Sequence, residues 1–230
     1  MSGATGPCVP RRRARVFVAA VVAVAIIQSR SKRGLTMLAE METLGYLPDD
    51  TNLIAAIQVE DAESSPERKE MLDRMGFGAD GAFDIERFSG LKRDRIEDAV
   101  LGLRVDNLIP PRIRLVIRTK SAYDVGAVRE KLGAVSSKKL GDREYDVIKV
   151  RPPGVPLTFE GALWCPSPRT LVVVFPQDDL EKVPVKPTDN VDRFGAPIAE
   201  LLKNRAERDT FFWLVGHSDD WDKTVFKSLF

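Results

Sequence analysis

Residues 112–120 (RIRLVIRTK) place an apolar side chain at every second position from 113 to 117, and this pattern limits the fold more than any other feature. The apolar residues are Ile113, Leu115 and Ile117, and the basic residues around them are Arg112, Arg114 and Arg118. An extended chain turns successive side chains to opposite faces, so the segment predicts a β-strand with one apolar face and one arginine-bearing face. The chain therefore contains a sheet.

The flanking segments predict an α+β fold. The expected order is a strand at 51–59, a helix at 65–76, strands at 99–105 and 112–120, a helix at 121–133 and a strand at 144–151. Ser65 and Pro66 are typical of a helix start, and Gly76 is typical of a helix end. Ser121 with Asp124 resembles a capping box for the second helix. This β-α-β-β-α-β order is that of a ferredoxin-like split βαβ unit, an antiparallel sheet with helices on one face.

Further elements are expected to extend the same sheet. Residues 157–164 and 170–175 flank a proline-rich turn and predict a hairpin, after which Pro197 opens a helix and residues 210–216 form a strand. Asp219 can cap a final helix, whose apolar side chains are Trp221, Val225, Phe226 and Leu229. With 43% hydrophobic and 30% charged residues, a 230-residue chain is not disordered, and we expect residues 46–230 to form a single domain.

The first 33 residues differ from the remainder in charge. They carry a charge of +7 with no acidic residue, whereas the rest of the chain carries −6. Between two basic clusters lie twelve consecutive apolar residues, 16–27 (VFVAAVVAVAII), which begin with Val16 and end with Ile27. We expect residues 1–33 to be a basic leader with a short anchor or signal segment, and residues 34–45 to be a spacer.

This leader predicts contact with a membrane. Including two uncharged polar residues, the run would rise about 21 Å as a helix, which is short of the roughly 30 Å hydrocarbon core. Its length suits the apolar region of a signal peptide. Three interpretations stay open: an uncleaved membrane anchor with an extracytoplasmic domain, a signal whose cleavage leaves a secreted or periplasmic domain, and a buried helix of a cytosolic protein.

The two cysteines are not expected to pair. Cys8 precedes the apolar run and Cys165 follows it, so a membrane-spanning leader would place them on opposite sides. Cys8 also lies on the wrong side of the run for a lipoprotein anchor.

Two short motifs resemble segments that open strands in uncharacterised bacterial membrane-anchored extracytoplasmic α+β domains. They are Tyr46-Leu47-Pro48-Asp49-Asp50-Thr51, with the pattern LP-x-D-x, and Cys165-Pro166-Ser167-Pro168-Arg169-Thr170-Leu171-Val172-Val173, with the pattern P-x-x-RTLV. The resemblance covers about residues 47–230 and implies an extracytoplasmic location and an α+β fold. It implies no catalytic residue.

Motifs that could carry chemistry lack the context that their chemistry needs. Residues 76–81 match G-x-G-x-x-G, but they follow a helix, whereas a dinucleotide-binding loop precedes one. His217 is the only histidine, so a zinc site there would lack ligands. The acidic pairs at 49–50, 178–179 and 219–220 are expected in solvated turns. We therefore predict no catalytic, cofactor-binding or metal-binding residue.

The function that these patterns favour is a non-enzymatic binding, sensing or scaffolding module outside the cytoplasm, tethered to the membrane or exported across it. Arg112, Arg114 and Arg118 could bind an anionic ligand or a protein partner. Two alternatives stay open: a hydrolase that uses the segment from His217 to Asp220, and a cytosolic binder of anions or nucleic acid that uses the arginine face. Nucleic acid is disfavoured because single-strand readers place aromatic side chains on such a face.

Overall fold

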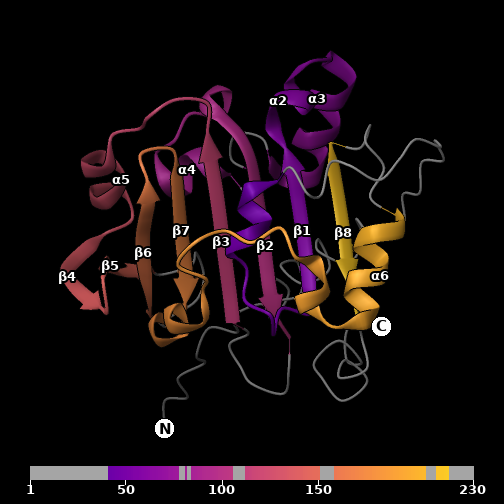
Figure 1. Ribbon diagram of the computed structural model, residues 1–230. Helices are drawn as coiled ribbons and strands as arrows, with labels where there is room; N and C mark the ends of the chain where they lie inside the picture. The colour runs from indigo at the N-terminus through magenta and orange to yellow at the C-terminus, as the bar shows by residue number, and fades with distance from the viewer. Residues whose placement is uncertain are drawn as a thin grey trace, which may run out of the picture.

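A computed structural model describes residues 41–77, 81, 84–105, 112–150, 158–205 and 211–217. Within these ranges the chain has an α+β fold with an eight-stranded sheet in the order β4-β5-β6-β7-β3-β2-β1-β8 (Figure 1). Every neighbouring pair of strands in this order is antiparallel. The α+β class and the antiparallel sheet predicted from the sequence are thus confirmed.

Seven of the eight strands lie close to their predicted positions. The eight strands are β1 (Leu53–Gln58), β2 (Ile96–Arg104), β3 (Arg112–Thr119), β4 (Ala134–Leu140), β5 (Arg143–Val150), β6 (Phe159–Ser167), β7 (Thr170–Phe175) and β8 (Phe212–Gly216). The hairpin predicted from residues 157–164 and 170–175 is confirmed as the antiparallel pair of β6 and β7. Strand β4 was not predicted, because its sequence AVSSKKL is polar and its middle residues are exposed.

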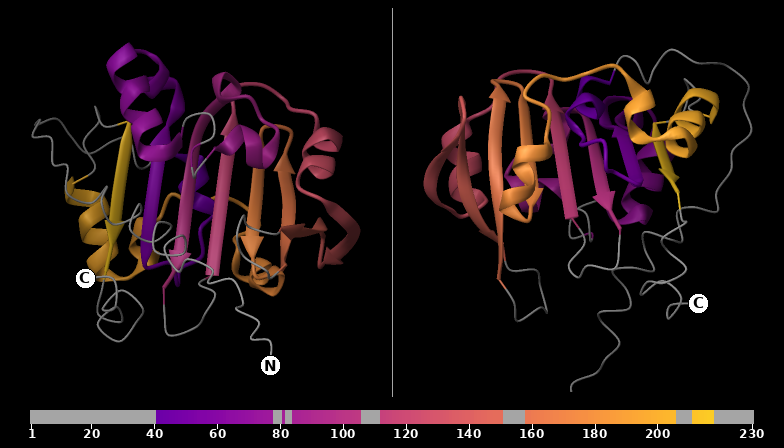
Figure 2. Two further views of the ribbon diagram at one scale, coloured as in Figure 1. Left: turned by 180° about the vertical axis from the view of Figure 1, so that it is seen from behind. Right: turned by 60° about the horizontal axis from the view of Figure 1, so that its bottom comes forward.

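Helices cover both faces of the sheet (Figure 2). On the back face lie α2 (Val59–Glu63), α3 (Pro66–Leu72), α4 (Ile85–Ser89) and α5 (Val125–Lys131). On the front face, which is turned toward the viewer in Figure 1, lie the 3-10 helices η3 (Glu42–Tyr46), η6 (Gln177–Lys182) and η7 (Val191–Phe194), and α6 (Ala196–Arg205). The helices of the predicted unit, α3 and α5, do share a face. The helix that follows this unit does not share that face, because Ile198 and Leu202 of α6 join the opposite core.

The apolar side chains of strand β7 require a hydrophobic core on each face of the sheet. Its sequence, TLVVVF, is apolar at successive positions from Leu171 to Phe175, so both of its faces need cover. Val172 and Val174 belong to the front core, whereas Leu171 and Val173 belong to the back core. A sheet with helices on one side would leave one of these pairs in water.

The ferredoxin-like strand order is not confirmed. A split βαβ unit needs its first two strands to be parallel and separated by another strand, whereas β1 and β2 are adjacent and antiparallel. The helices between them are short, and α3 is followed by a turn in which Gly76 has a φ of 87°. The chain therefore returns to the sheet at the end where it left, and β2 runs back beside β1.

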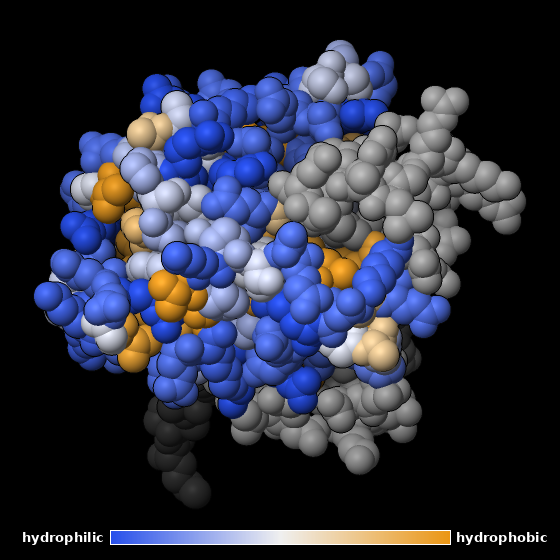
Figure 3. Space-filling view, in the orientation of Figure 1, coloured by the Kyte–Doolittle hydropathy of each residue, from blue (hydrophilic) through white to orange (hydrophobic). Residues whose placement is uncertain are grey.

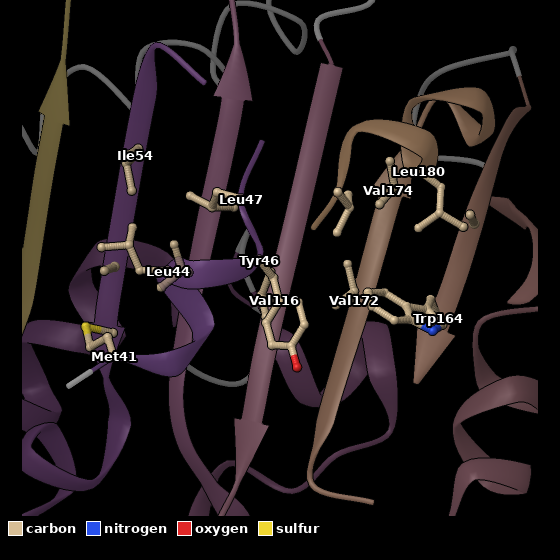
Figure 4. Packing of buried hydrophobic residues seen from close by; sticks show 14 of the residues in the cluster. Met41, Leu44, Tyr46, Leu47, Ile54, Val116, Trp164, Val172, Val174 and Leu180 are labelled. Atoms are coloured by element: carbon tan, nitrogen blue, oxygen red, sulfur yellow. The ribbon is translucent and has the colours of Figure 1, made fainter. Parts of the chain in front are cut away.

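The front core is built around the segment that leads into β1. Met41, Leu44 and Tyr46 are buried, so the folded unit includes residues within the predicted spacer at 34–45. The rings of Tyr46 and Trp164 meet edge to face, with centroids 5.8 Å apart (Figure 4). Toward the viewer, the described surface over this core is mostly hydrophilic (Figure 3).

Several predicted features lie outside the described residues, namely the apolar run at 16–27, Cys8 and the final helix after Asp219. In the ranges that are described, no helix is long and apolar enough to cross a bilayer.

Replacing Leu202 by Ala tests the two-sided cover of the sheet. The side chain is 1% exposed in the front core, so its truncation should lower the free energy of unfolding by about 3 kcal/mol in urea titrations. Glu200→Ala, at an exposed position of the same helix, is the matched control and should have little effect. Equal effects of the two substitutions would show that α6 does not pack on the sheet.

Candidate functional site

The arginine row of β3 lies on the front face of the sheet, on the same side as the buried Val116. Its members are not equally accessible: the Arg114 side chain is 0% exposed, compared with 29% for Arg112 and 20% for Arg118. Each of these guanidinium groups meets carboxylates from segments that cross the front face. We name the two resulting groups of charges by their central carboxylates.

The Asp50 cluster surrounds the start of β3 and consists of Asp50, Arg112, Arg114, Asp179 and Lys182. The Asp50 carboxylate lies 3.0 Å from Arg114 Nη2, 3.4 Å from Arg112 Nη1 and 2.9 Å from Lys182 Nζ. The buried Asp179 is in contact with Arg114 and lies 3.7 Å from Arg112 and 3.3 Å from Lys182. Three cations thus share two carboxylates, which leaves one positive charge in excess.

Local backbone structure brings the carboxylates of this cluster to the sheet. Gly102 lies opposite Arg114 in the ladder, and a Cβ added there would come within 2.7 Å of the Leu47 side chain. The glycine therefore makes room for Leu47, which lets the turn that carries Asp50 approach the sheet. Thr51 fixes this turn, since its N–H and hydroxyl both donate to the Pro48 carbonyl, at 3.1 and 2.7 Å.

Charge pairing sets the ionisation of this cluster. Burial disfavours the charged form of Asp50, but a hydrogen bond from Lys182 and the charges of Arg114, Lys182 and Arg112 outweigh burial and lower its pKa. The same hydrogen bond to Asp50 raises the pKa of Lys182. Asp50 and Lys182 are therefore both charged at neutral pH.

Arg114 is not fully satisfied by this pairing. Its Nε and Nη1 atoms are buried and form no hydrogen bond with any described residue. Arg93 and Arg193 each leave one such nitrogen, whereas Arg114 leaves two. A buried donor without an acceptor costs about 1–3 kcal/mol. Asp179 Oδ2, which is in contact with Arg114 Nη2, is also buried without a hydrogen bond of regular geometry, so the unsatisfied polar atoms of the cluster gather around this guanidinium.

The Asp98 cluster lies at the other end of β3 and consists of Glu42, Glu97, Asp98, Arg118 and Arg169. A bulge in β2 between Ile96 and Asp98 lets two successive carboxylates reach one guanidinium. Arg118 lies 2.8 Å from both Glu97 and Asp98 and 3.6 Å from Glu42, while Arg169 lies 2.6 Å from Glu97. Here acids outnumber bases, in contrast to the Asp50 cluster.

Asp98 connects the sheet to the first described segment, because the Thr43 hydroxyl of η3 donates to its carboxylate. Burial raises the pKa of Asp98, and the hydrogen bond from Thr43 and the charge of Arg118 offset this only in part. The acid excess of the cluster acts in the same direction, since Glu97 also raises the pKa of Asp98.

The other residues singled out from the sequence are placed elsewhere. The backbone N–H of His217 donates to the Asn52 carbonyl at 2.9 Å, which extends the pairing of β8 with β1, and residues 218–220 lie outside the described part. Burial raises the pKa of the Cys165 thiol, so it is not poised as a thiolate nucleophile. Within the described ranges no three His, Cys, Asp or Glu side chains are grouped to hold a metal ion.

Two acidic pairs contribute to the site in a way that the sequence did not reveal. In the first pair, the Asp49 carboxylate lies 3.1 Å from Arg193, whereas the Asp50 carboxylate contacts the arginine row. In the second pair, Asp178 is exposed, whereas Asp179 is buried. The pairs were visible in the sequence, but nothing there indicated that one member of each reaches β3.

Comparisons of the chain with protein-family models, with curated proteins and with solved structures find no match.

Replacing Asp179 by Asn tests the energetic role of the Asp50 cluster. The substitution leaves Arg114 buried with less compensating charge, and it should lower the free energy of unfolding by about 3 kcal/mol in urea. Arg74→Gln removes the exposed Arg74–Glu70 pair and serves as the control, with an expected change of about 0.5 kcal/mol or less. A loss for Asp179→Asn no larger than the control's would contradict this role.

Asp98→Asn should change the pH dependence of stability. Because the pKa of Asp98 is higher in the folded chain than its ordinary value of 3.8, the folded chain takes up this proton more readily than the unfolded chain. The contribution of Asp98 to stability therefore grows as the pH falls toward 3.8 and is lost as the pH rises. Urea titrations across this range should show wild type gaining stability relative to the D98N variant on acidification. The D94N variant, at an exposed position, should follow wild type, and a constant difference between wild type and D98N would refute the assignment.

Proposed function

We propose that this chain is a non-enzymatic extracytoplasmic binding, sensing or scaffolding module, tethered to the membrane or exported across it through residues 16–27. The observation that carries the proposal is the partnering of the arginine row. Its guanidinium groups meet carboxylates from several segments, an arrangement that holds layers together and can recognise charge.

The charge distribution supports the same proposal. The basic leader and the acidic remainder suit different surroundings, the first near a membrane surface and the second in solution. Partner recognition is assigned to the front face, where the arginine row lies beside partly exposed charged side chains.

The proposed location outside the cytoplasm is tested with a full-length chain that carries a C-terminal tag. In bacterial spheroplasts, protease added from outside should digest the tag, and fractionation should recover the chain with the membrane or the periplasm. The double variant V18R/V24R places two charges in the apolar run, each costing about 2.5–3.5 kcal/mol on insertion, and should remain in the cytosol. Ser31→Arg, outside the run, is the control and should behave as wild type. Recovery of the wild-type chain in the soluble cytosol would refute the placement and favour the cytosolic anion binder.

A further inference from the structure

We infer that the cations of the Asp50 cluster form a binding site for an oxyanion, and that the Asp50 carboxylate occupies this site until a carboxylate or phosphate group of a ligand replaces it. The inference rests on the proposed function, because it names the recognition site and ligand class of the binding module.

The first argument is the convergence of three cations on one carboxylate. Arg112, Arg114 and Lys182 come from two elements far apart in the sequence, β3 and η6, and all lie within 3.4 Å of Asp50. Two guanidinium groups and an ammonium group around a carboxylate provide the donors by which proteins bind carboxylate and phosphate ligands. Asp50 thus shows what kind of group fits between them.

The second argument is the charge that remains after pairing. The cluster keeps one positive charge in excess, and Arg104, which lies opposite Arg112 in the ladder, donates to the main-chain carbonyl of Asp50 at 3.4 Å. A ligand that replaces the Asp50 carboxylate meets three cations and one remaining carboxylate, Asp179, so the site can accept an anion with two negative charges. The Asp98 cluster has an excess of acid, so the arginine row attracts anions at the start of β3 rather than at its end.

The third argument is Arg114 itself. This guanidinium is fully buried and leaves two nitrogen donors without a described partner, whereas its Nη2 atom contacts both carboxylates. A structure that needed Arg114 only to hold Asp179 would not require the unpaired donors. They are donors of the cluster that an oxygen atom of a ligand would satisfy.

The two carboxylates have different roles because they differ in exposure. The Asp179 side chain is 3% exposed and holds the base of the cluster, whereas Asp50 is 30% exposed and lies with Lys182 and Arg112 at its solvent side. Asp50 sits on the turn at 48–51, so a ligand can replace its carboxylate by a local change without disturbing the sheet. Asp50 is therefore the internal competitor of the ligand.

The test is isothermal titration of the full chain in detergent with inorganic phosphate and, separately, with succinate, at constant ionic strength set by sodium chloride. The D50N variant removes the competing charge and should bind at least one of the two anions about tenfold more tightly than wild type. The R112Q and K182Q variants should each bind about tenfold more weakly. Lys186→Gln, at an exposed position of the segment that follows η6, is the matched control and should bind as wild type does.

The outcomes separate the possibilities. Tighter binding of phosphate would identify a phosphoryl ligand, and tighter binding of succinate would identify a carboxylate ligand. Three results would each overturn the inference: neither anion binds, K182Q and K186Q weaken binding equally, or the D50N variant binds no more tightly than wild type. If circular dichroism shows that D50N misfolds, the comparison of K182Q with K186Q decides. A chain that lies outside the cytoplasm but ignores both anions would overturn this inference alone, whereas a cytosolic chain that binds them would overturn the placement alone.

Discussion

The structure depends on the pairing of buried and partly buried guanidinium groups with carboxylates on the front face of the sheet. Arginine on a central strand is stable under a second layer only if acids neutralise it, because an unpaired charge away from water is very costly. Strand β3 carries three arginines on this face, and the acids come from η3, β2, η6 and the turn before β1. The charges that face the sheet therefore decide where the front layer lies.

This constraint links the architecture to the proposed function. Apolar packing around Tyr46, Trp164 and Leu180 supplies the area that stabilises the front layer, while the ion pairs fix its position. The two ends of the arginine row have opposite charge balance, so they differ in what they can do. The acid-rich end holds the first described segment through Thr43 and Asp98, whereas the base-rich end can receive an anion.

Much of the fold followed from local patterns, and the errors have physical causes. Alternation located β1 and β3, and the Ser65–Pro66 start located α3, because these signals depend on neighbouring residues alone. Strand β4 was not predicted because an edge strand can be polar on both faces and then shows no alternation of apolar and polar residues. The ferredoxin-like order was not confirmed because order along the chain does not specify which strands pair. Only part of the candidate site could be predicted from the sequence. The arginines were identified, but Asp179 and Lys182 were not identified as their neighbours in the cluster.

By itself, the sequence determined that the first 33 residues are basic and include an apolar run, that the remainder is acidic and has an α+β fold, and that a row of arginines lies on one face of a strand. These properties come from composition and short-range periodicity, which do not depend on distant contacts. Only the tertiary structure decided that α6 covers the arginine-bearing face, that Asp50 and Asp179 meet Arg114 there, and that Asp98 meets Arg118. The physical reason is that charge pairing arises between residues as far apart as Asp49 and Arg193, which are separated by 144 positions, and no local pattern encodes such a contact.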